Sequence, residues 1–279
     1  MNLPRISIVT PSYQHARYLE NALVSVIEQG YPDVEYFVMD GGSIDGSKAL
    51  IQKYAGRLAF WQSEPDGGQV EAINAAFRKA TGIILAFVNS DDFLLPEALK
   101  HVADAYLARP EAVAWVGAGH DVAEDGFILR TRLPKGLSIE ELADWEVNWI
   151  FQPSCFFSAA AAHRVGYLNP HYENAFDFDF WLRLAQQGEF VAVREVLAAA
   201  TIHADTKTLR FMPRMFEEVQ AIQRRYGYAA LAEATEASLT RARAQTHIGS
   251  AAKLLYTSQT KRRAHPESFV RLPAARPKV

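Results

Sequence analysis

Ala86-Phe87-Val88-Asn89-Ser90-Asp91-Asp92-Phe93-Leu94 is the stretch of this sequence that decides the fold. It joins an apolar run, residues 83–88, which is typical of a buried strand, to a polar turn with two adjacent aspartates. Leu95-Pro96-Glu97 then predicts the start of a helix, because proline is favoured in the first helical turn. Two neighbouring carboxylates repel each other, so Asp91 and Asp92 favour a bound cation. The alternative is a polar loop, in which aspartate is common.

A second strand-like run, residues 35–39, also ends in an acidic turn. Asp40 closes the run, and Gly41-Gly42 permits a tight turn and the close approach of a ligand. Asp40 is therefore a candidate to accept hydrogen bonds from a nucleobase or a ribose. The alternative interpretation is a tight strand-to-helix turn in which Asp45 or Ser47 is the helix N-cap.

The N-terminal strand, residues 6–9, ends in a third polar segment, Thr10-Pro11-Ser12-Tyr13. The helix predicted over residues 16–29 carries its apolar side chains on one face, which is typical of packing against a sheet. The carboxyl ends of parallel strands meet at one edge of an α/β sheet, where ligands bind. We therefore expect the three polar turns to lie together.

Strand and helix alternate along the first part of the chain, which predicts βαβ units and a parallel sheet. The predicted elements are residues 6–9, 16–29, 36–39, 47–54, 58–62, 69–80, 83–88 and 96–108. Beyond residue 112 the pattern changes to short strands (113–117, 127–131), a helix near 138–145, a helix over 178–187 and a strand over 190–198. From residue 211 to about 257 the composition is typical of helix.

Composition excludes several classes of protein. The chain has 279 residues, 49% hydrophobic and 22% charged, as in ordinary globular proteins. A formal net charge of −3 argues against a general nucleic-acid binder. The single cysteine, Cys155, fits a reducing compartment and is expected to be a buried small residue. Neither a signal peptide nor a membrane span is predicted, and the glycine motifs of P-loop NTPases and Rossmann dehydrogenases are missing.

Several motifs that occur in order along the chain resemble the family 2 glycosyltransferases. They are Thr10-Pro11-Ser12-Tyr13, Asp40-Gly41-Gly42-Ser43-Ile44-Asp45-Gly46, Glu64-Pro65-Asp66-Gly67-Gly68-Gln69, Asn89-Ser90-Asp91-Asp92, Asp177-Phe178-Asp179-Phe180-Trp181-Leu182-Arg183-Leu184 and His203-Ala204-Asp205-Thr206-Lys207-Thr208. The resemblance covers roughly residues 4–210. It implies the GT-A fold, a Rossmann-like α/β architecture with a mostly parallel sheet flanked by helices, and an enzyme that uses nucleotide-diphosphate sugars.

The resemblance also implies roles for the matching positions. The nucleotide-sugar would be bound by Thr10, Pro11, Tyr13, Asp40, Gly41, Asp66, Gln69, Asp91 and Lys207, with Asp40 pairing to the base. Asp92 and His203 would hold Mg²⁺ or Mn²⁺ against the diphosphate, since hard carboxylate oxygens suit hard cations. Without the family context, His203 would be interpreted as a histidine at a strand end, and Asp66 as an ordinary turn residue.

Asp177 would be the general base that takes the proton of the acceptor hydroxyl, and one base with a single displacement gives inversion at the anomeric carbon. The commoner Glu-Asp pair of the family is replaced by Phe176 before Asp177, which leaves Asp179 as the alternative base. We interpret Asp179 as a helix-start residue that points elsewhere. Trp149 and Gln152 are acceptor-site or donor-sugar candidates, although a core tryptophan is an equal alternative.

The sequence therefore predicts a metal-dependent, inverting, non-processive glycosyltransferase. Its donor would be a nucleotide-sugar, with UDP favoured, and its acceptor a glycan or a lipid-linked glycan. Processive synthases of the family carry Gln-x-x-Arg-Trp, whereas Gln223-Arg224-Arg225-Tyr226 lacks the tryptophan. The alternatives are a nucleotidyltransferase on a similar scaffold, and a non-catalytic nucleotide-sugar-binding protein.

We divide the chain into a GT-A domain over residues 1–210 and a C-terminal helical extension with a basic tail over residues 211–279. Residues 1–108 would be the nucleotide-binding half of the domain and residues 109–210 the acceptor-binding half. The last nineteen residues hold six Lys and Arg against one Glu, so their charge is 6 − 1 = +5. We favour a solvated terminus. The alternative is peripheral contact with the anionic inner face of a membrane, for a protein that is otherwise cytoplasmic.

Overall fold

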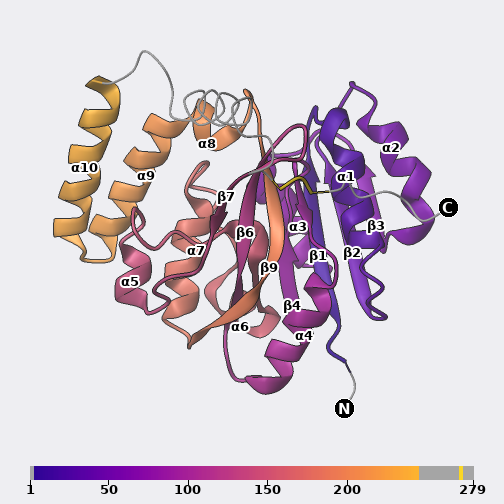
Figure 1. Cartoon of the computed structure of the whole chain (residues 1–279), viewed down its shortest axis with the longest axis horizontal. Coiled ribbons are helices and arrows are strands. Elements are labelled where there is room, and N and C mark those ends of the chain that lie inside the picture. The colour runs from indigo at the N-terminus through magenta and orange to yellow at the C-terminus, as the bar shows by residue number, and fades with distance from the viewer. Residues whose placement is uncertain (1–2, 245–269, 273–279) are drawn as a thin grey trace.

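A single mixed sheet with helices on both faces forms the body of the protein (Figure 1). The computed structural model describes residues 3–244 and 270–272. The sheet order is β3-β2-β1-β4-β8-β6-β9-β5, and β7 pairs with β6 beside this path. The α/β class that the sequence predicted, with a mostly parallel sheet flanked by helices, is confirmed.

The first half of the sheet is parallel, as the alternation of strands and helices predicted. It consists of β1 (Ile6–Ser12), β2 (Val34–Asp40), β3 (Phe60–Ser63) and β4 (Ile84–Phe87). Ser12 lies opposite Asp40, and Asp40 opposite Ser63, so these three strands end at the same level. The polar segments that follow them are therefore brought to one edge of the sheet.

The second half of the sheet contains antiparallel pairs. Its strands are β5 (Asp92–Leu94), β6 (Ala114–Ala123), β7 (Ile128–Arg132), β8 (Cys155–Ser158) and β9 (Phe190–Ile202). β8 runs antiparallel to β4 and β6, whereas β6 and β9 are parallel. The sequence did not predict β5 and β8, because runs of three and four residues are too short for an alternation of apolar and polar residues to appear.

The described helices are α1 (Ala16–Ile27), α2 (Ser47–Tyr54), α3 (Gln69–Phe77), α4 (Ala98–Ala108), α5 (Ile139–Ala143), α6 (Ala159–Val165), α7 (Phe176–Ala185), α8 (Lys207–Arg210), α9 (Met212–Arg225) and α10 (Ala229–Ala244), with short 3₁₀ turns at Ala55–Arg57 and Gln152–Ser154. Helix α4 begins two residues later than predicted, because Glu97 has a left-handed backbone with φ of 62°. Helix α6 was not predicted. The N-cap of α2 is Gly46 rather than Asp45 or Ser47, although the Asp45 carboxylate accepts a hydrogen bond from the Ser47 backbone N–H at 3.0 Å.

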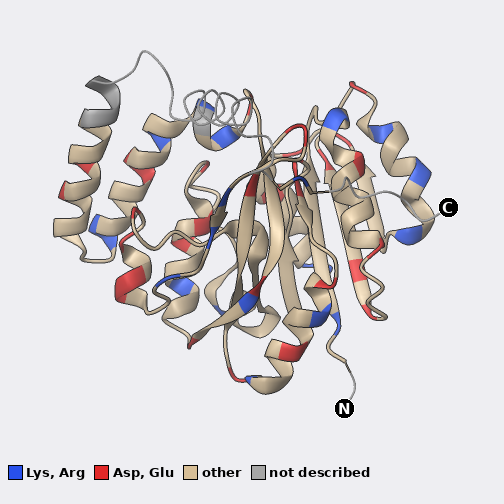
Figure 2. Cartoon of the chain, viewed as in Figure 1, with Lys and Arg blue, Asp and Glu red and all other residues tan. Residues whose placement is uncertain are grey.

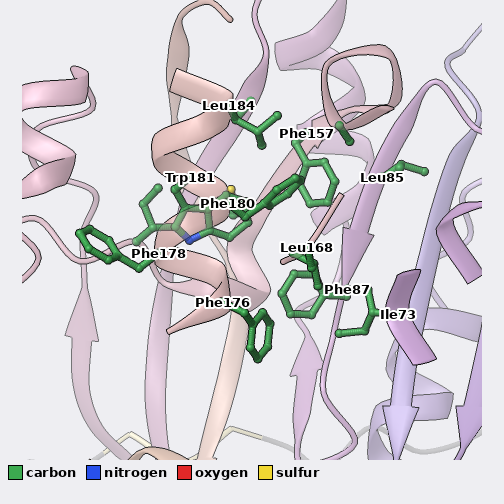
Figure 3. Packing of buried hydrophobic residues seen from close by; sticks show 14 of the residues in the cluster. Ile73, Leu85, Phe87, Phe157, Leu168, Phe176, Phe178, Phe180, Trp181 and Leu184 are labelled. Carbon is green, nitrogen blue, oxygen red and sulfur yellow. The ribbon is translucent and has the colours of Figure 1, made fainter. Parts of the chain in front are cut away.

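Two apolar layers sandwich the sheet because alternate strand residues point to opposite faces. Ile8 packs with α1, α2 and α4 on one face, whereas its neighbour Val9 packs with α3, α6 and α7 on the other. Figure 3 shows the second layer, where Phe180 and Trp181 of α7 meet Phe157 of β8. Cys155 is buried in this layer, as predicted.

The helical extension continues the core of the domain. Met215, Val219 and Ile222 of α9 belong to the same buried cluster as α7, and α10 lies beside α9 (Figure 1). The predicted helix beyond residue 244 and most of the basic tail lie outside the described residues. Residues 270–272 form a bridge through Arg271 to Phe127, next to the turn between β6 and β7. In the described part of the chain, no helix is long and apolar enough to cross a membrane.

Candidate active site

A cavity of about 1410 Å³ opens at the edge of the sheet where β1, β2 and β4 end. Segments from both halves of the chain line it, including the turn after β4, the start of α7 and the segment that leads into α8. Twelve of the sequence-predicted site residues lie on its wall: Pro11, Tyr13, Gly41, Asp66, Gln69, Asp91, Asp92, Trp149, Gln152, Asp177, His203 and Lys207. The structure therefore brings most of the predicted site together.

Thr10 and Asp40 do not reach the cavity wall. The Thr10 hydroxyl is buried and lies 2.8 Å from the hydroxyl of Tyr36. The buried Asp40 carboxylate accepts hydrogen bonds from the Ser43 hydroxyl at 2.6 Å and the Ser63 hydroxyl at 2.7 Å. Thr10 thus contacts the interior of β2. The Asp40 contacts join the end of β2 to the turn that follows it and to the end of β3, from behind the cavity wall.

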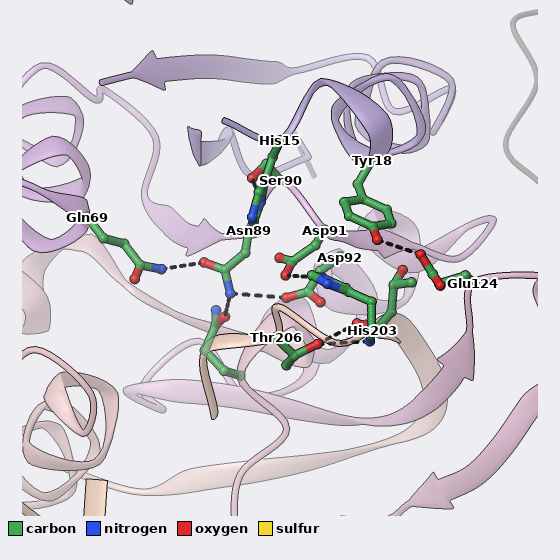
Figure 4. Close-up of polar contacts among 12 residues, drawn as sticks. His15, Tyr18, Gln69, Asn89, Ser90, Asp91, Asp92, Glu124, His203 and Thr206 are labelled. Carbon is green, nitrogen blue, oxygen red and sulfur yellow. Dashed lines mark hydrogen bonds and ion pairs between the residues drawn. The ribbon is translucent and has the colours of Figure 1, made fainter. Parts of the chain in front are cut away.

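Asp91 and Asp92 form a carboxylate pair at the start of β5 (Figure 4). Asp92 is 7% exposed, and Asn89 Nδ2 donates a hydrogen bond to its Oδ2 at 3.1 Å. Burial, and secondly the charge of Asp91, raise the pKa of Asp92 well above its ordinary value. His203 Nε2 lies 3.2 Å from Asp91 Oδ2. A divalent cation fits this pair, because it would neutralise the charge that burial disfavours.

The protein side chains alone do not enclose a metal ion. Among the residues that the structure describes, no group of three or more His, Cys, Asp or Glu side chains is arranged to hold one. Mg²⁺ is usually held by one or two carboxylates together with phosphate oxygens and water. The pair of Asp91 and Asp92 is a donor set of that open kind.

An aromatic and hydrogen-bonded frame holds His203 in place. The Tyr18 ring of α1 stacks on the His203 ring with centroids 4.4 Å apart, and the Tyr18 hydroxyl donates to Glu124 at 2.6 Å. His15 Nδ1 lies 2.8 Å from the Ser90 hydroxyl (Figure 4). The sequence did not predict these neighbours, because Tyr18 lies within a helix whose pattern indicates only its apolar face, and Glu124 belongs to a turn-like segment.

A chain of amide hydrogen bonds connects the carboxylate pair to Lys207. Gln69 Nε2 donates to Asn89 Oδ1 at 2.8 Å, while Lys207 Nζ donates to Gln69 Oε1 at 3.0 Å. Asn89 Nδ2 also donates to Gln152 Oε1 at 3.1 Å. Burial lowers the pKa of Lys207, against the opposing effect of the Asp177 carboxylate. The network fixes these side chains relative to Asp92.

Asp177 lies on the cavity wall in the first turn of α7. Its Oδ1 accepts a hydrogen bond from the Phe178 backbone N–H at 2.8 Å. Burial raises its pKa to about 6, against the hydrogen bond and the nearby charge of Lys207. A carboxylate with a pKa in this range, exposed to a cavity, is suited to general-base catalysis.

Asp179 is fully buried away from the cavity. Arg183 Nε donates to its Oδ2 at 2.8 Å, and Arg183 also donates to the carbonyl oxygens of Val165 and Tyr167. The two carboxylates of the motif therefore differ in kind. Asp177 can meet a substrate, whereas Asp179 holds the packing of α7.

The carboxylate of Glu218 in α9 binds the backbone of the segment that leads into α7. Its Oε2 accepts hydrogen bonds from the backbone N–H groups of Asn174 and Ala175, both at 2.8 Å, and its Oε1 accepts from Glu173 N at 3.1 Å. This carboxylate therefore satisfies backbone donors just before the helix that carries Asp177. The sequence offered no signal for it, because Glu218 lies in the helical extension.

We expect Glu218→Gln to lower kcat about tenfold with little effect on donor affinity. The substitution removes charge-assisted hydrogen bonds worth roughly 1.5–3 kcal/mol each, so the start of α7 is held less firmly. The Glu218 charge also contributes to the raised pKa of Asp177, so the acidic limb of the pH–rate profile should move to lower pH. Measuring kcat across pH, with Glu217→Gln on the same helix as control, checks this. An unchanged pH limb with only a lower melting temperature would mean that Glu218 is merely structural.

The comparison with known proteins assigns the family. A sequence profile described as glycosyl transferase family 2 matches residues 7–164, which is more than half of the chain. The chain belongs to glycosyl transferase family 2. The family and the enzyme class that the sequence predicted are thus confirmed.

Relatives of this family 2 chain include proteins of very different length. It is 32% identical over 200 residues to an uncharacterised glycosyltransferase of Mycobacterium tuberculosis, with 70% of this chain and 74% of that protein covered. It is 27% identical over 213 residues to chondroitin synthase of Pasteurella multocida, with 75% of this chain and 22% of the synthase covered. The chain therefore spans about a fifth of the length of that synthase.

Solved structures share the fold of this family 2 chain. S. aureus TarS 1–349 in complex with UDP has a TM-score of 0.60 at 19% identity, covering 78% of this chain and 64% of that one. Mannosyltransferase PcManGT from Pyrobaculum calidifontis, in complex with GDP-Man and Mn²⁺, has a TM-score of 0.62 at 20% identity, covering 95% of this chain and 82% of that one. At these identities the likeness establishes the fold, and the GT-A architecture that the sequence predicted is confirmed.

Proposed function

We propose that this family 2 glycosyltransferase moves a sugar from a nucleotide-diphosphate sugar, with a UDP-sugar favoured, to a hydroxyl of a glycan or lipid-linked glycan. The reaction would be metal-dependent, inverting and non-processive. One observation carries the proposal. A single cavity at the strand ends contains a carboxylate pair, Asp91 and the buried Asp92, and a separate carboxylate of raised pKa, Asp177.

The donor would lie across the ends of β1 and β2. Pro11, Tyr13 and Gly41 line this side of the cavity, with Asp66 and Gln69 beyond them. TarS has been solved with UDP and PcManGT with GDP-Man, which supports a nucleotide-sugar donor. Asp40, behind the wall, would act by holding the turn through Ser43 and Ser63 rather than by touching the base.

Asp91 and Asp92 would hold Mg²⁺ or Mn²⁺, and PcManGT, solved with Mn²⁺, supports the second ion. When bound, the cation would neutralise the diphosphate as it leaves. His203 would orient Asp91, because its Nε2 lies 3.2 Å from Asp91 Oδ2. The same nitrogen would coordinate the ion if the ring turned toward it. Lys207 would add positive charge beside the diphosphate.

Asp177 would take the proton of the acceptor hydroxyl. The hydroxyl oxygen then forms its bond to the anomeric carbon while the bond from that carbon to the diphosphate breaks, which inverts the configuration. Trp149 and Gln152 line the same cavity and would contact the acceptor or the donor sugar. A sugar ring can pack on an aromatic face such as that of Trp149.

The raised pKa of Asp177 gives a prediction for pH. Because the base must be ionised, we expect kcat/KM to fall tenfold per unit below about pH 6 in the free enzyme. A carboxyl group whose pKa is raised in the folded state lowers stability as pH rises through that pKa. Asp177→Asn should therefore melt at a higher temperature than the wild type above pH 6. A melting temperature that is equal or lower at pH 7.5 would contradict the raised pKa.

We further propose a cytoplasmic protein that makes peripheral contact with a membrane. The single Cys155 favours a reducing compartment such as the cytoplasm. The basic tail would contact the anionic inner face of a membrane, and the net charge of −3 gives no support to a nucleic-acid partner. Membership of family 2 argues against the nucleotidyltransferase alternative. A non-catalytic binding protein would differ from our proposal by releasing no nucleotide from any donor.

A thermal-shift screen tests the donor. UDP-, GDP- and dTDP-sugars would each be added with Mn²⁺ and again with excess EDTA. We expect one nucleotide class to raise the melting temperature, and only with the metal present. Stabilisation by no nucleotide-sugar, or equal stabilisation in EDTA, would contradict the proposal.

A further inference from the structure

Two arginines of β7 face the cavity, and the reaction described above does not use them. Arg130 and Arg132 are separated by one residue, so both side chains leave the same face of the strand. Both line the cavity, as does Asp121 on the neighbouring strand β6. Figure 2 shows the basic residues of β7 in blue, on the strand that pairs with β6 beside the main path of the sheet.

Asp121 is shared by the two arginines. Its carboxylate is 2% exposed, and Arg132 Nε donates to both of its oxygens, at 3.0 and 3.3 Å, while Arg130 Nε binds Oδ2. One carboxylate thus compensates two guanidinium groups, which leaves a net positive charge. Both arginines use Nε for this contact, and in the described part of the chain their terminal nitrogens make no hydrogen bond.

Arg132 also stacks on Trp149, with the guanidinium carbon 3.8 Å from the ring centroid. Its side chain is only 19% exposed, and burial lowers its pKa to about 10 despite Asp121. The guanidinium is thus held between a ring and a carboxylate on the wall of the cavity. A fixed guanidinium edge suits bidentate recognition of a carboxylate or a phosphate.

The stacked pair lies on the side of the cavity where the base is. Trp149 and Asp177 together line a second, smaller cavity, and Trp145 lies 6.1 Å from Trp149 between ring centroids. A ring bound against Trp149 would therefore have its hydroxyls near the carboxylate that accepts the proton. This placement favours the acceptor over the leaving diphosphate as the partner of the arginines.

We propose that Arg130 and Arg132 bind an acidic group, a carboxylate or a phosphate, on the acceptor sugar of this enzyme. The inference rests on the proposed function, since it assigns the charge of the acceptor at the same site. Asp121 fixes the two side chains by their Nε atoms, and their terminal nitrogens receive the acid. A neutral acceptor would leave these terminal nitrogens without an acidic partner. The Arg132 side chain is only 19% exposed, so water replaces that partner poorly there, which is the physical basis of the discrimination.

Matched sugars that differ only in the group at C6, acidic in one and neutral in the other, test the proposal. Saturation-transfer NMR, with UDP and Mn²⁺ present, would compare glucuronate with glucose, galacturonate with galactose, and glucose 6-phosphate with glucose. We expect at least one acidic sugar to bind about tenfold more tightly than its neutral partner, and the ratio to approach one in Arg132→Gln. The uronates and the sugar phosphate separate the two sources of charge. If no acidic sugar binds more tightly than its neutral partner, the proposal is wrong.

Arg109→Gln is the matched control, because Arg109 has 46% side-chain exposure against 47% for Arg130 and also pairs with carboxylates, Glu111 and Glu189. It should leave the ratio unchanged. Arg130→Gln, at the more exposed position, provides the test if Arg132→Gln fails to fold.

UDP affinity in the presence of Mn²⁺ separates this inference from the proposed function. Weaker UDP binding in Arg132→Gln would assign the arginines to the donor diphosphate and overturn the inference. A wild-type protein that binds no nucleotide would overturn the proposed function instead.

Discussion

The Asp177→Asn variant should bind its nucleotide-sugar as the wild type does, yet transfer the sugar about 10²–10⁴-fold more slowly, the usual cost of losing a general base. Asparagine keeps the shape of the side chain and can still accept the hydrogen bond from the Phe178 backbone N–H. The structure gives no reason for a folding defect, since the lost charge is one that burial disfavours. Single-turnover transfer rates and UDP affinity, measured on the same preparation, check the separation.

Asp179→Asn is the matched variant two residues away. Because Asp179 is fully buried against Arg183, losing its charge should destabilise the fold by roughly 3 kcal/mol while the folded fraction keeps its turnover. The two variants should thus give opposite results. Loss of turnover in Asp179→Asn with retention in Asp177→Asn would show that the base is wrongly assigned, and retention in both would remove the catalytic role from this motif.

Asp92→Asn should abolish the effect of the divalent cation. Burial and the neighbouring Asp91 make the ionised Asp92 unfavourable without a cation, so the fold gains stability when the charge is removed and loses the affinity for the metal. We expect the turnover to be at least about 10²-fold lower, because removing a group that stabilises charge in the transition state typically lowers kcat by this factor. We also expect that Mn²⁺ no longer improves the affinity for UDP. Calorimetric titration of UDP with and without Mn²⁺ checks this. Asp104→Asn, on α4, is the control.

A UDP affinity that Mn²⁺ still improves in Asp92→Asn would mean that the ion lies elsewhere. A variant that is less stable than the wild type would contradict the account of Asp92 as a buried charge without compensation. The two outcomes are independent, because one concerns the ligand and the other the protein alone.

The positions of candidate site residues could be predicted where a polar or charged side chain borders a strand or helix with a clear apolar pattern. The carboxylates at residues 91 and 92 were predicted to lie at a strand end beside the turn after β1, and the structure places them there. Asp177 and Asp179 were distinguished by the direction of helical side chains, and the structure gives only the first to the cavity. Local patterns sufficed because each of these residues follows or begins a regular element.

Asp40 marks the limit of that reasoning. Its place at the end of β2 is the one predicted, but the direction of its carboxylate depends on Ser63, a residue that only the pairing of β2 with β3 brings near. Arg132 and Glu218 show the same limit. Their partners, Trp149 and the backbone before α7, come from distant parts of the chain, and no spacing in the sequence reports such contacts.

The release of UDP from a UDP-sugar by the wild-type protein tests the central claim most directly. A panel of UDP-sugars would be incubated with Mn²⁺, with excess EDTA, and with Mn²⁺ restored after the EDTA, and the freed UDP would be measured over time. The account predicts release from at least one donor with Mn²⁺, none in EDTA, and recovery when the metal returns. Release that continues undiminished in EDTA, or no release from any nucleotide-sugar offered, would contradict it.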